Sequence, residues 1–138
     1  MPEVTINYWA VLAAGVASMV LGWLWYGALF GKAWMKMSGL TKEKLDEQKK
    51  KGMATSYILA FVGTLVMAYV LAHMVDYTQS TSTKMAAQAG FWLWLGFIGP
   101  TTLESVLWEG KSWKLWFFNA AHGLLSIIVM AIILVKWV

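Results

Sequence analysis

Four long runs of apolar residues, separated by shorter polar stretches, make up most of the chain. The run at residues 8–30 holds no charged side chain. As a helix rising about 1.5 Å per residue it would be roughly 34 Å long, enough to cross the hydrocarbon core of a bilayer. Comparable runs cover residues 55–75, 86–108 and 116–135. The pattern therefore predicts an all-α, polytopic membrane protein, with one domain at 1–138 that contains four transmembrane helices.

Lysine positions predict the orientation of these helices. Seven lysines lie in the connection at residues 31–54, and Lys111 and Lys114 follow the third run, against Lys84 and Lys136 on the opposite side. Cationic loops tend to remain in the cytoplasm. We therefore expect two out-in-out helical hairpins in the cell membrane, with both basic connections cytoplasmic and both chain ends non-cytoplasmic.

A short surface helix is predicted at residues 42–51 of the long inner connection. Thr41 suits the N-cap and Gly52 suits the position after the last turn. The lysines of that turn complement the helix dipole. The basic charge could dock a partner or anionic lipid, or it could serve only to fix the topology, which the positive-inside rule favours.

The two predicted hairpins share short sequences. The first run is followed by GKAW at residues 31–34 and the third by GKSW at 110–113, while VMA occurs at both 66–68 and 129–131. These matches predict a parallel internal repeat with the surface helix as an insertion in its first copy. The alternative is that two inner membrane exits have converged on similar residues.

Composition narrows the function classes. The chain is 59% hydrophobic and only 13% charged, which leaves too little polar surface for a soluble domain of this size. It has no cysteine, so thiolate catalysis and cysteine metal sites are excluded. We also find no Ser-His-Asp set, metalloprotease motif or phosphate-binding glycine loop, and expect neither enzymatic activity nor a metal or cofactor. Because the basic cluster lies between apolar runs, the expected partner is the lipid bilayer, not nucleic acid.

Small residues recur at helical spacing in the first two runs. Helices in lipid gain little from hydrophobic association and rely on close packing. We expect these faces to contact another helix, either in the same chain or in a second copy, and the small size of the domain favours a homodimer or higher oligomer. The residues are Ala14, Ser18, Gly22, Gly27 and Gly31 in the first run, and Ala60, Thr64, Ala68 and Ala72 in the second.

Polar residues of the third and fourth runs form the candidate site. Gly99 and Pro100 predict a helix kink, because proline lacks a backbone donor and clashes with the preceding turn. Glu104 would come level with Asn119 and His122 in a tight hairpin. A carboxylate beside an imidazole in a membrane can relay protons or bind a cation. The structural alternative, which we favour, is that the three groups only satisfy one another and clamp the two helices.

The sequence GWLWYGALFGKAWM at residues 22–35 resembles the signature of a prokaryotic integral membrane family, domain of unknown function 1761 (DUF1761). Further matches occur in order along nearly the whole chain: INY at 6–8, GLT at 39–41, LVMAYVL at 65–71, EGK at 109–111, and Asn119 followed by His122. The resemblance implies a small four-helix membrane protein and carries no assigned activity.

Strong packing patterns with little reactive chemistry favour a non-enzymatic protein that works by assembling, as a homo-oligomer or as an accessory component of another membrane protein. The alternative is a small transporter or channel for protons, cations or a small solute that uses Glu104, Asn119 and His122. An enzyme acting on lipid near Glu104, Glu109 and His122 is the least favoured hypothesis.

Overall fold

The computed structural model describes residues 1–137. Every secondary-structure element in this range is a helix, and the range contains no β-strand. The all-α prediction is thus confirmed for this part of the chain. Along the sequence the elements are α1 (Tyr8–Trp23), the π-helical segment η1 (Leu24–Leu29), α2 (Gly31–Ser38), α3 (Lys42–Lys51), α4 (Ala54–Tyr77), α5 (Thr83–Leu93), the π-helical segment η2 (Trp94–Ile98), α6 (Gly99–Leu107) and α7 (Trp113–Lys136).

Within residues 1–137, three helices are long and apolar enough to cross a membrane: Tyr8–Leu29, which joins α1 and η1, then Ala54–Tyr77 and Trp113–Lys136. They correspond to the first, second and fourth predicted runs. The third predicted run, 86–108, is not among these candidate spans, and it is divided among α5, η2 and α6, which follow one another directly. Apolar helices of this kind indicate a membrane-embedded protein.

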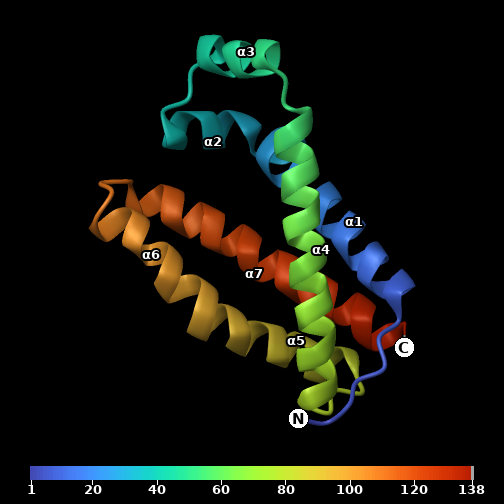
Figure 1. The fold of residues 1–138 in the computed structure, drawn as a ribbon. Coiled ribbons are helices and arrows are strands. Elements are labelled where there is room, and N and C mark those ends of the chain that lie inside the picture. The colour runs from blue at the N-terminus through green and yellow to red at the C-terminus, as the bar shows by residue number, and fades with distance from the viewer. Residues whose placement is uncertain (138) are drawn as a thin grey trace.

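The long helices meet at the end of the molecule where both chain termini lie, whereas α2, α3 and the α6–α7 turn lie away from the termini (Figure 1). Asn7 connects the two ends of the chain. Its side-chain oxygen caps α1 by accepting hydrogen bonds from the amides of Trp9 and Ala10, and its Nδ2 donates to the carbonyl of Trp137 at 3.3 Å. The N-terminal cap of α1 is therefore tied to the C-terminal end of α7.

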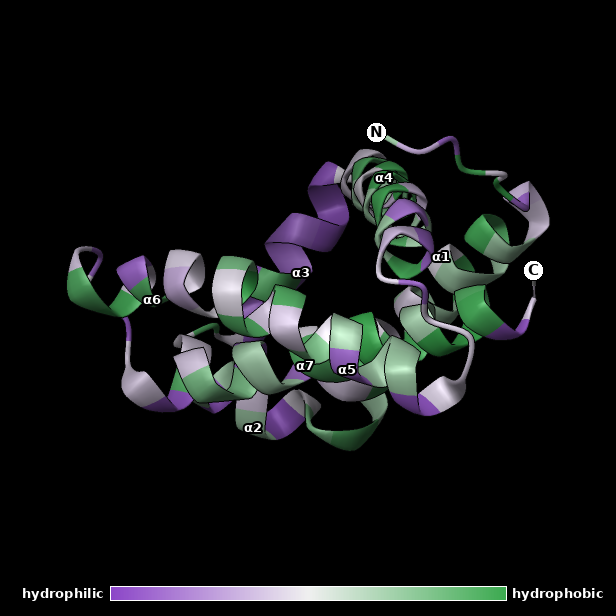
Figure 2. Ribbon diagram, turned by 90° about the horizontal axis from the view of Figure 1, so that it is seen from below, coloured by the Kyte–Doolittle hydropathy of each residue, from purple (hydrophilic) through white to green (hydrophobic). Residues whose placement is uncertain are grey.

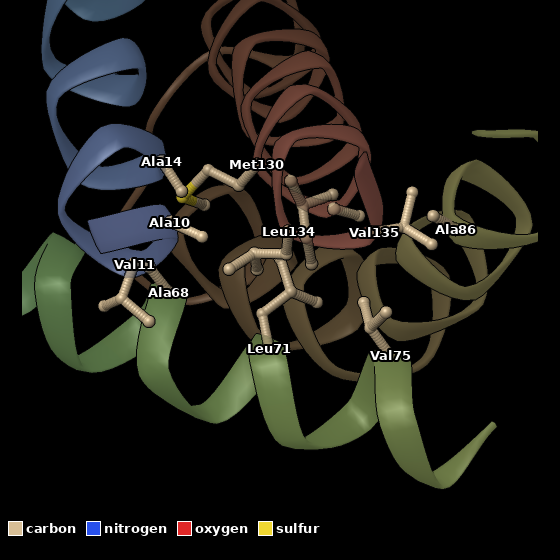
Figure 3. Close-up of a cluster of buried hydrophobic side chains, with 12 residues drawn as sticks. Ala10, Val11, Ala14, Ala68, Leu71, Val75, Ala86, Met130, Leu134 and Val135 are labelled. Atoms are coloured by element: carbon tan, nitrogen blue, oxygen red, sulfur yellow. The ribbon is translucent and has the colours of Figure 1, made fainter. Parts of the chain in front are cut away.

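Side chains from α1, α4, α5 and α7 form the hydrophobic core near this end (Figure 3). Four of its alanines, Ala14, Ala68, Ala86 and Ala131, are 0% exposed, and Met130 is the largest fully buried side chain. Small side chains allow helix backbones to approach closely, which is the main source of helix association in lipid. The core is therefore narrow, with one flexible methionine at its centre.

Helix α3 confirms the predicted surface helix, with both bounds as expected. The Thr41 hydroxyl accepts a hydrogen bond from the Lys44 amide at 3.2 Å, and Gly52 ends the helix with a φ of 87°, which favours glycine. Figure 2 shows that α3 is almost wholly hydrophilic, whereas α4 and α7 are mainly hydrophobic. The residues that predicted the two ends of this helix, Thr41 and Gly52, thus occupy its N-cap and C-cap.

Candidate functional site

Tyr26 of η1 lies against the polar face of α7. Its hydroxyl donates a hydrogen bond of 2.7 Å to Oδ1 of Asn119, and its ring centroid is 5.0 Å from that of His122. The neighbouring Trp25 ring is 6.1 Å from His122. The π-helical segment therefore supplies two aromatic side chains to the site, and π-helical turns are frequent at functional sites. The predicted residues Asn119 and His122 do lie together, one turn apart on α7.

Two buried polar atoms at this site, Nε1 of Trp25 and Nε2 of His122, have no hydrogen-bond partner among the described residues. An unpaired buried donor or acceptor costs about 1–3 kcal/mol, so such atoms are uncommon and mark places where a water or polar ligand can bind. Gly22 leaves room beside the imidazole, because a Cβ added there would lie 3.7 Å from Nε2 of His122.

The sequence WLWYG at residues 23–27 recurs as WLWLG at 92–96, and each copy overlaps a π-helical segment. Trp94 occupies the place of Trp25 in the second copy, and its Nε1 donates to the carbonyl of Ala120 at 2.9 Å. The indole N–H at this position is thus hydrogen-bonded in the second copy, at Trp94, and unpaired in the first copy, at Trp25. Trp25 and Tyr26 were not among the predicted site residues, because Tyr26 contacts a residue on α7 about ninety positions later and no local sequence pattern indicates that contact.

The structure does not bring Glu104 into the predicted cluster. Glu104 is exposed, and no hydrogen bond joins it to Asn119 or His122 in the described chain. The face of α6 that meets α7 carries Thr102, whose hydroxyl accepts a 3.2 Å hydrogen bond from Nε1 of Trp116. Two residues further on, Glu104 is turned roughly 200° around the helix and points away. Tyr26 takes the place that we had assigned to Glu104.

The predicted kink at Gly99 and Pro100 coincides with the start of α6, directly after η2. The Gly99 amide donates to the carbonyl of Trp94, five residues earlier, so the helix widens before the proline, and the ribbon changes direction between α5 and α6 (Figure 1). Threonine hydroxyls add hydrogen bonds in this turn: Thr101 donates to the carbonyl of Phe97 at 2.6 Å and Thr102 to that of Ile98 at 2.7 Å. A wide turn in place of a broken helix thus accommodates Pro100.

A pocket of about 650 Å³ opens beside Asn119, between α2 and the α6–α7 turn. We call it the basic pocket, because its only charged lining residues are lysines. Its polar and aromatic lining residues are Trp34, Lys36, Ser38, Lys111, Ser112 and Asn119. Asn119 therefore faces both the Tyr26 hydroxyl and this pocket.

A family model described as protein of unknown function (DUF1761) matches residues 9–135, almost the full length of the chain. The chain belongs to this family. No curated protein and no solved structure matches it. The matched residues include nearly all of the long apolar helices of the described chain and the site residues Asn119 and His122 on α7.

In this DUF1761 chain, the small residues of α1 pack within the same molecule. Ala14 is fully buried, and the Ser18 hydroxyl lies 2.6 Å from that of Ser126 on α7. Gly22 lies one turn further along the same stripe and faces His122. The predicted stripe at Ala14, Ser18 and Gly22 is therefore an intramolecular contact with α7, which spacing alone could not determine.

The predicted small-residue stripe of α4 also packs within the same molecule over most of its length. Ala68 is fully buried, Thr64 and Ala72 are half-buried, and the Thr64 hydroxyl lies 3.9 Å from Sδ of Met19 on α1. Ala60 is exposed. Most of the predicted α4 stripe thus packs inside one DUF1761 molecule.

Gly27 and Gly31, the other predicted packing pair, do not contact another helix of the described chain. A Cβ added at Gly27 would meet only Trp23 within 4 Å, and one at Gly31 would meet only the backbone of Tyr26. Gly27 lies within η1 and Gly31 begins α2, so the two glycines do not share one regular α-helix with the four-residue spacing that the prediction assumed.

Among the described residues, α4 is exposed at every position from 54 to 60, and one face of its first half carries small side chains. Ser56, Ala60 and Gly63 are exposed, and nothing lies within 4 Å of a Cβ added at Gly63. The same face continues through Met67 and Val70, which line an apolar groove of about 490 Å³ formed with η2 and α7. We call Ser56, Ala60, Gly63, Met67, Val70 and Met74 the open face of α4.

Proposed function

We propose that this DUF1761 chain is a non-enzymatic, multi-pass membrane protein that works by assembling with a second copy of itself through the open face of α4. The observation that carries the proposal is the combination of small, exposed residues in the first half of this face with an apolar groove below them. In lipid, helix pairs form where small residues let backbones approach.

The proposal includes four membrane crossings, with α1 and α4 as one out-in-out hairpin and α5–η2–α6 and α7 as the other. Two features support this topology. The helix from α5 to α6 is about as long as α4 and α7. The termini lie at one end of the molecule and the lysine-rich α3 at the other, as the positive-inside rule requires if α3 is cytoplasmic (Figure 1).

The spacing of the open face suits a parallel helix pair. Its residues follow one another at steps of four, three, four, three and four, which keeps a single seam facing a partner helix. Two copies with the same orientation in a membrane are related by an axis along the membrane normal, so α4 would meet α4 of the second copy. Gly63 would then lie near the closest approach, where only a small side chain fits.

Disulfide crosslinking tests this proposal directly, because the chain has no cysteine of its own. Gly63→Cys and Ala60→Cys are expected to form covalent dimers in oxidised membranes, since both positions lie on the proposed seam. Ile58→Cys is the matched control, because Ile58 is 63% exposed on a different side of α4. Dimers at Ile58→Cys as abundant as those at Gly63→Cys would contradict the proposal, as would their absence at all three positions. Crosslinks to another membrane protein instead would indicate the accessory role.

A second candidate function is transport of protons or a small polar solute through the Tyr26, Asn119 and His122 site. The unpaired nitrogens of Trp25 and His122 favour it, because they are free to bind such a solute. Purified protein in proteoliposomes would then carry a flux that His122→Phe abolishes. Glu104→Gln is the matched control and is expected to leave the flux unchanged, because Glu104 is exposed away from the site. A wild-type protein that supports no flux would exclude this function.

A further inference from the structure

The basic pocket presents two lysines and no acidic side chain. Lys36 comes from α2, and Lys111 comes from the α6–α7 turn, so two segments far apart in sequence bring their positive charges to one cavity of about 650 Å³. Like charges that share a cavity repel each other, and an anion between them removes that repulsion. The charge of the pocket therefore selects for an anionic ligand.

Asn119 adds an oriented donor to the same pocket. Its Oδ1 accepts the hydrogen bond from the Tyr26 hydroxyl, which leaves the two N–H groups of Nδ2 for another partner. Tyr26 therefore fixes the Asn119 amide with its donors unused. A ligand in the pocket would meet ammonium and amide N–H groups together, which suits the several acceptor oxygens of a phosphate.

The surroundings of the pocket place it at a membrane interface. Trp108 and Trp113 flank the α6–α7 turn and are 82% and 53% exposed. Exposed tryptophans are typical of the headgroup level of a bilayer. The pocket, at about 650 Å³, is also large enough for a small organic phosphate or a phospholipid headgroup.

We propose that the basic pocket binds the phosphate group of an anionic ligand, which is either the headgroup of an anionic phospholipid or a soluble organic phosphate. Lys36 and Lys111 supply the charge, and Asn119, held by Tyr26, supplies the directed hydrogen bonds. This site is separate from the open face of α4 and does not depend on self-assembly.

Binding titrations on the full chain in detergent micelles test the proposal with three probes: short-chain phosphatidylglycerol, short-chain phosphatidylcholine and glycerol 3-phosphate. The test variant is Lys36→Gln with Lys111→Gln. The matched control is Lys44→Gln with Lys49→Gln, which removes the same charge from α3. Both pairs are exposed, so the variants are expected to unfold at about the wild-type temperature, and circular dichroism checks this.

We expect phosphatidylglycerol to bind better than phosphatidylcholine, and the test variant to lose roughly thirtyfold in affinity for it, the effect of two lysines near an anionic headgroup. The control should change affinity by less than about threefold. Glycerol 3-phosphate binding with the same variant dependence, without a preference between lipids, would identify a soluble ligand. Equal losses in both variants would overturn the proposal, because they would reflect total charge. Failure of both phosphatidylglycerol and glycerol 3-phosphate to bind would also overturn it.

Discussion

Replacing Trp25 and Trp94 by phenylalanine, one at a time, should have unequal effects on stability. The two residues occupy the same place in the repeated WLWxG sequence, and both are half-buried. Trp94 donates a 2.9 Å hydrogen bond to the Ala120 carbonyl, whereas the Trp25 N–H is buried and unpaired. Both variants replace an indole by a phenyl ring. The difference between their free energies of unfolding therefore reports whether the indole N–H that was removed had a hydrogen-bond partner.

The expected difference follows from hydrogen-bond energetics. Trp94→Phe loses a net contribution of about 1 kcal/mol, while Trp25→Phe removes an unpaired N–H that costs the native protein about 1–3 kcal/mol. Aromatic packing of Trp25 on Phe30 and Phe118, at ring distances of 4.8 and 5.3 Å, is largely available to a phenylalanine. Trp94→Phe should therefore be less stable than Trp25→Phe by about 2 kcal/mol or more.

Reversible unfolding in mixed micelles of increasing sodium dodecyl sulfate content, followed by far-ultraviolet circular dichroism, measures both variants against the wild type. Helix content is the suitable signal, because the chain holds ten tryptophans and fluorescence would mix their responses. An equal or larger loss of stability for Trp25→Phe would contradict this prediction. It would mean that the Trp25 N–H has a partner in the native protein.

Two further predictions concern close helix contacts. Gly22→Leu should destabilise the single molecule by about 1–3 kcal/mol, because the leucine side chain must displace His122. Gly63→Leu should leave the unfolding of the monomer nearly unchanged, because nothing lies within 4 Å of a Cβ added there. The same micelle titration compares the two variants, and an equal loss of stability would count against the contact between Gly22 and His122. Ser18→Ala should cost about 0.6 kcal/mol through the 2.6 Å contact with Ser126. A double-mutant cycle with Ser126→Ala measures that coupling, and independent effects would show that the two hydroxyls do not interact.

Local features of the fold could be predicted from the sequence because their causes are local. The α3 helix has its cap residue Thr41 and its terminating Gly52 within or beside its own ten residues, so both ends followed from capping chemistry. Apolar runs likewise located the long helices to within a few residues, since length and hydrophobicity alone determine them.

The site was only partly predictable because register depends on the π-helical segments. An assumed tight hairpin placed Glu104 level with Asn119 and His122, but η2 widens the helix before α6 and Thr102, not Glu104, contacts Trp116 of α7. Asn119 and His122 were placed correctly because α7 is one uninterrupted helix. Their partner Tyr26 comes from a segment about ninety residues earlier, a contact that no local pattern encodes.

The partner helix of each small-residue stripe could not be predicted from the sequence either. Spacing correctly indicated that Ala14, Ser18 and Ala68 contact other helices, but it could not indicate which helix. These residues join α1, α4 and α7 of one molecule, whereas Ser56, Ala60 and Gly63 are exposed in the described chain. The face proposed for assembly thus emerged only when the internal contacts were known.

The most direct measurement of the proposed assembly is the distance between spin labels attached at Gly63→Cys in two copies of the chain, read in frozen lipid bilayers from the dipolar broadening of continuous-wave electron paramagnetic resonance spectra. Paired helices lie about 8–10 Å apart, so assembly through α4 predicts a short distance of roughly 10–20 Å once the label arms are included, and spectra broader than those of a sample diluted with unlabelled protein. Spectra no broader than those of the diluted sample would show isolated molecules and would contradict assembly through α4.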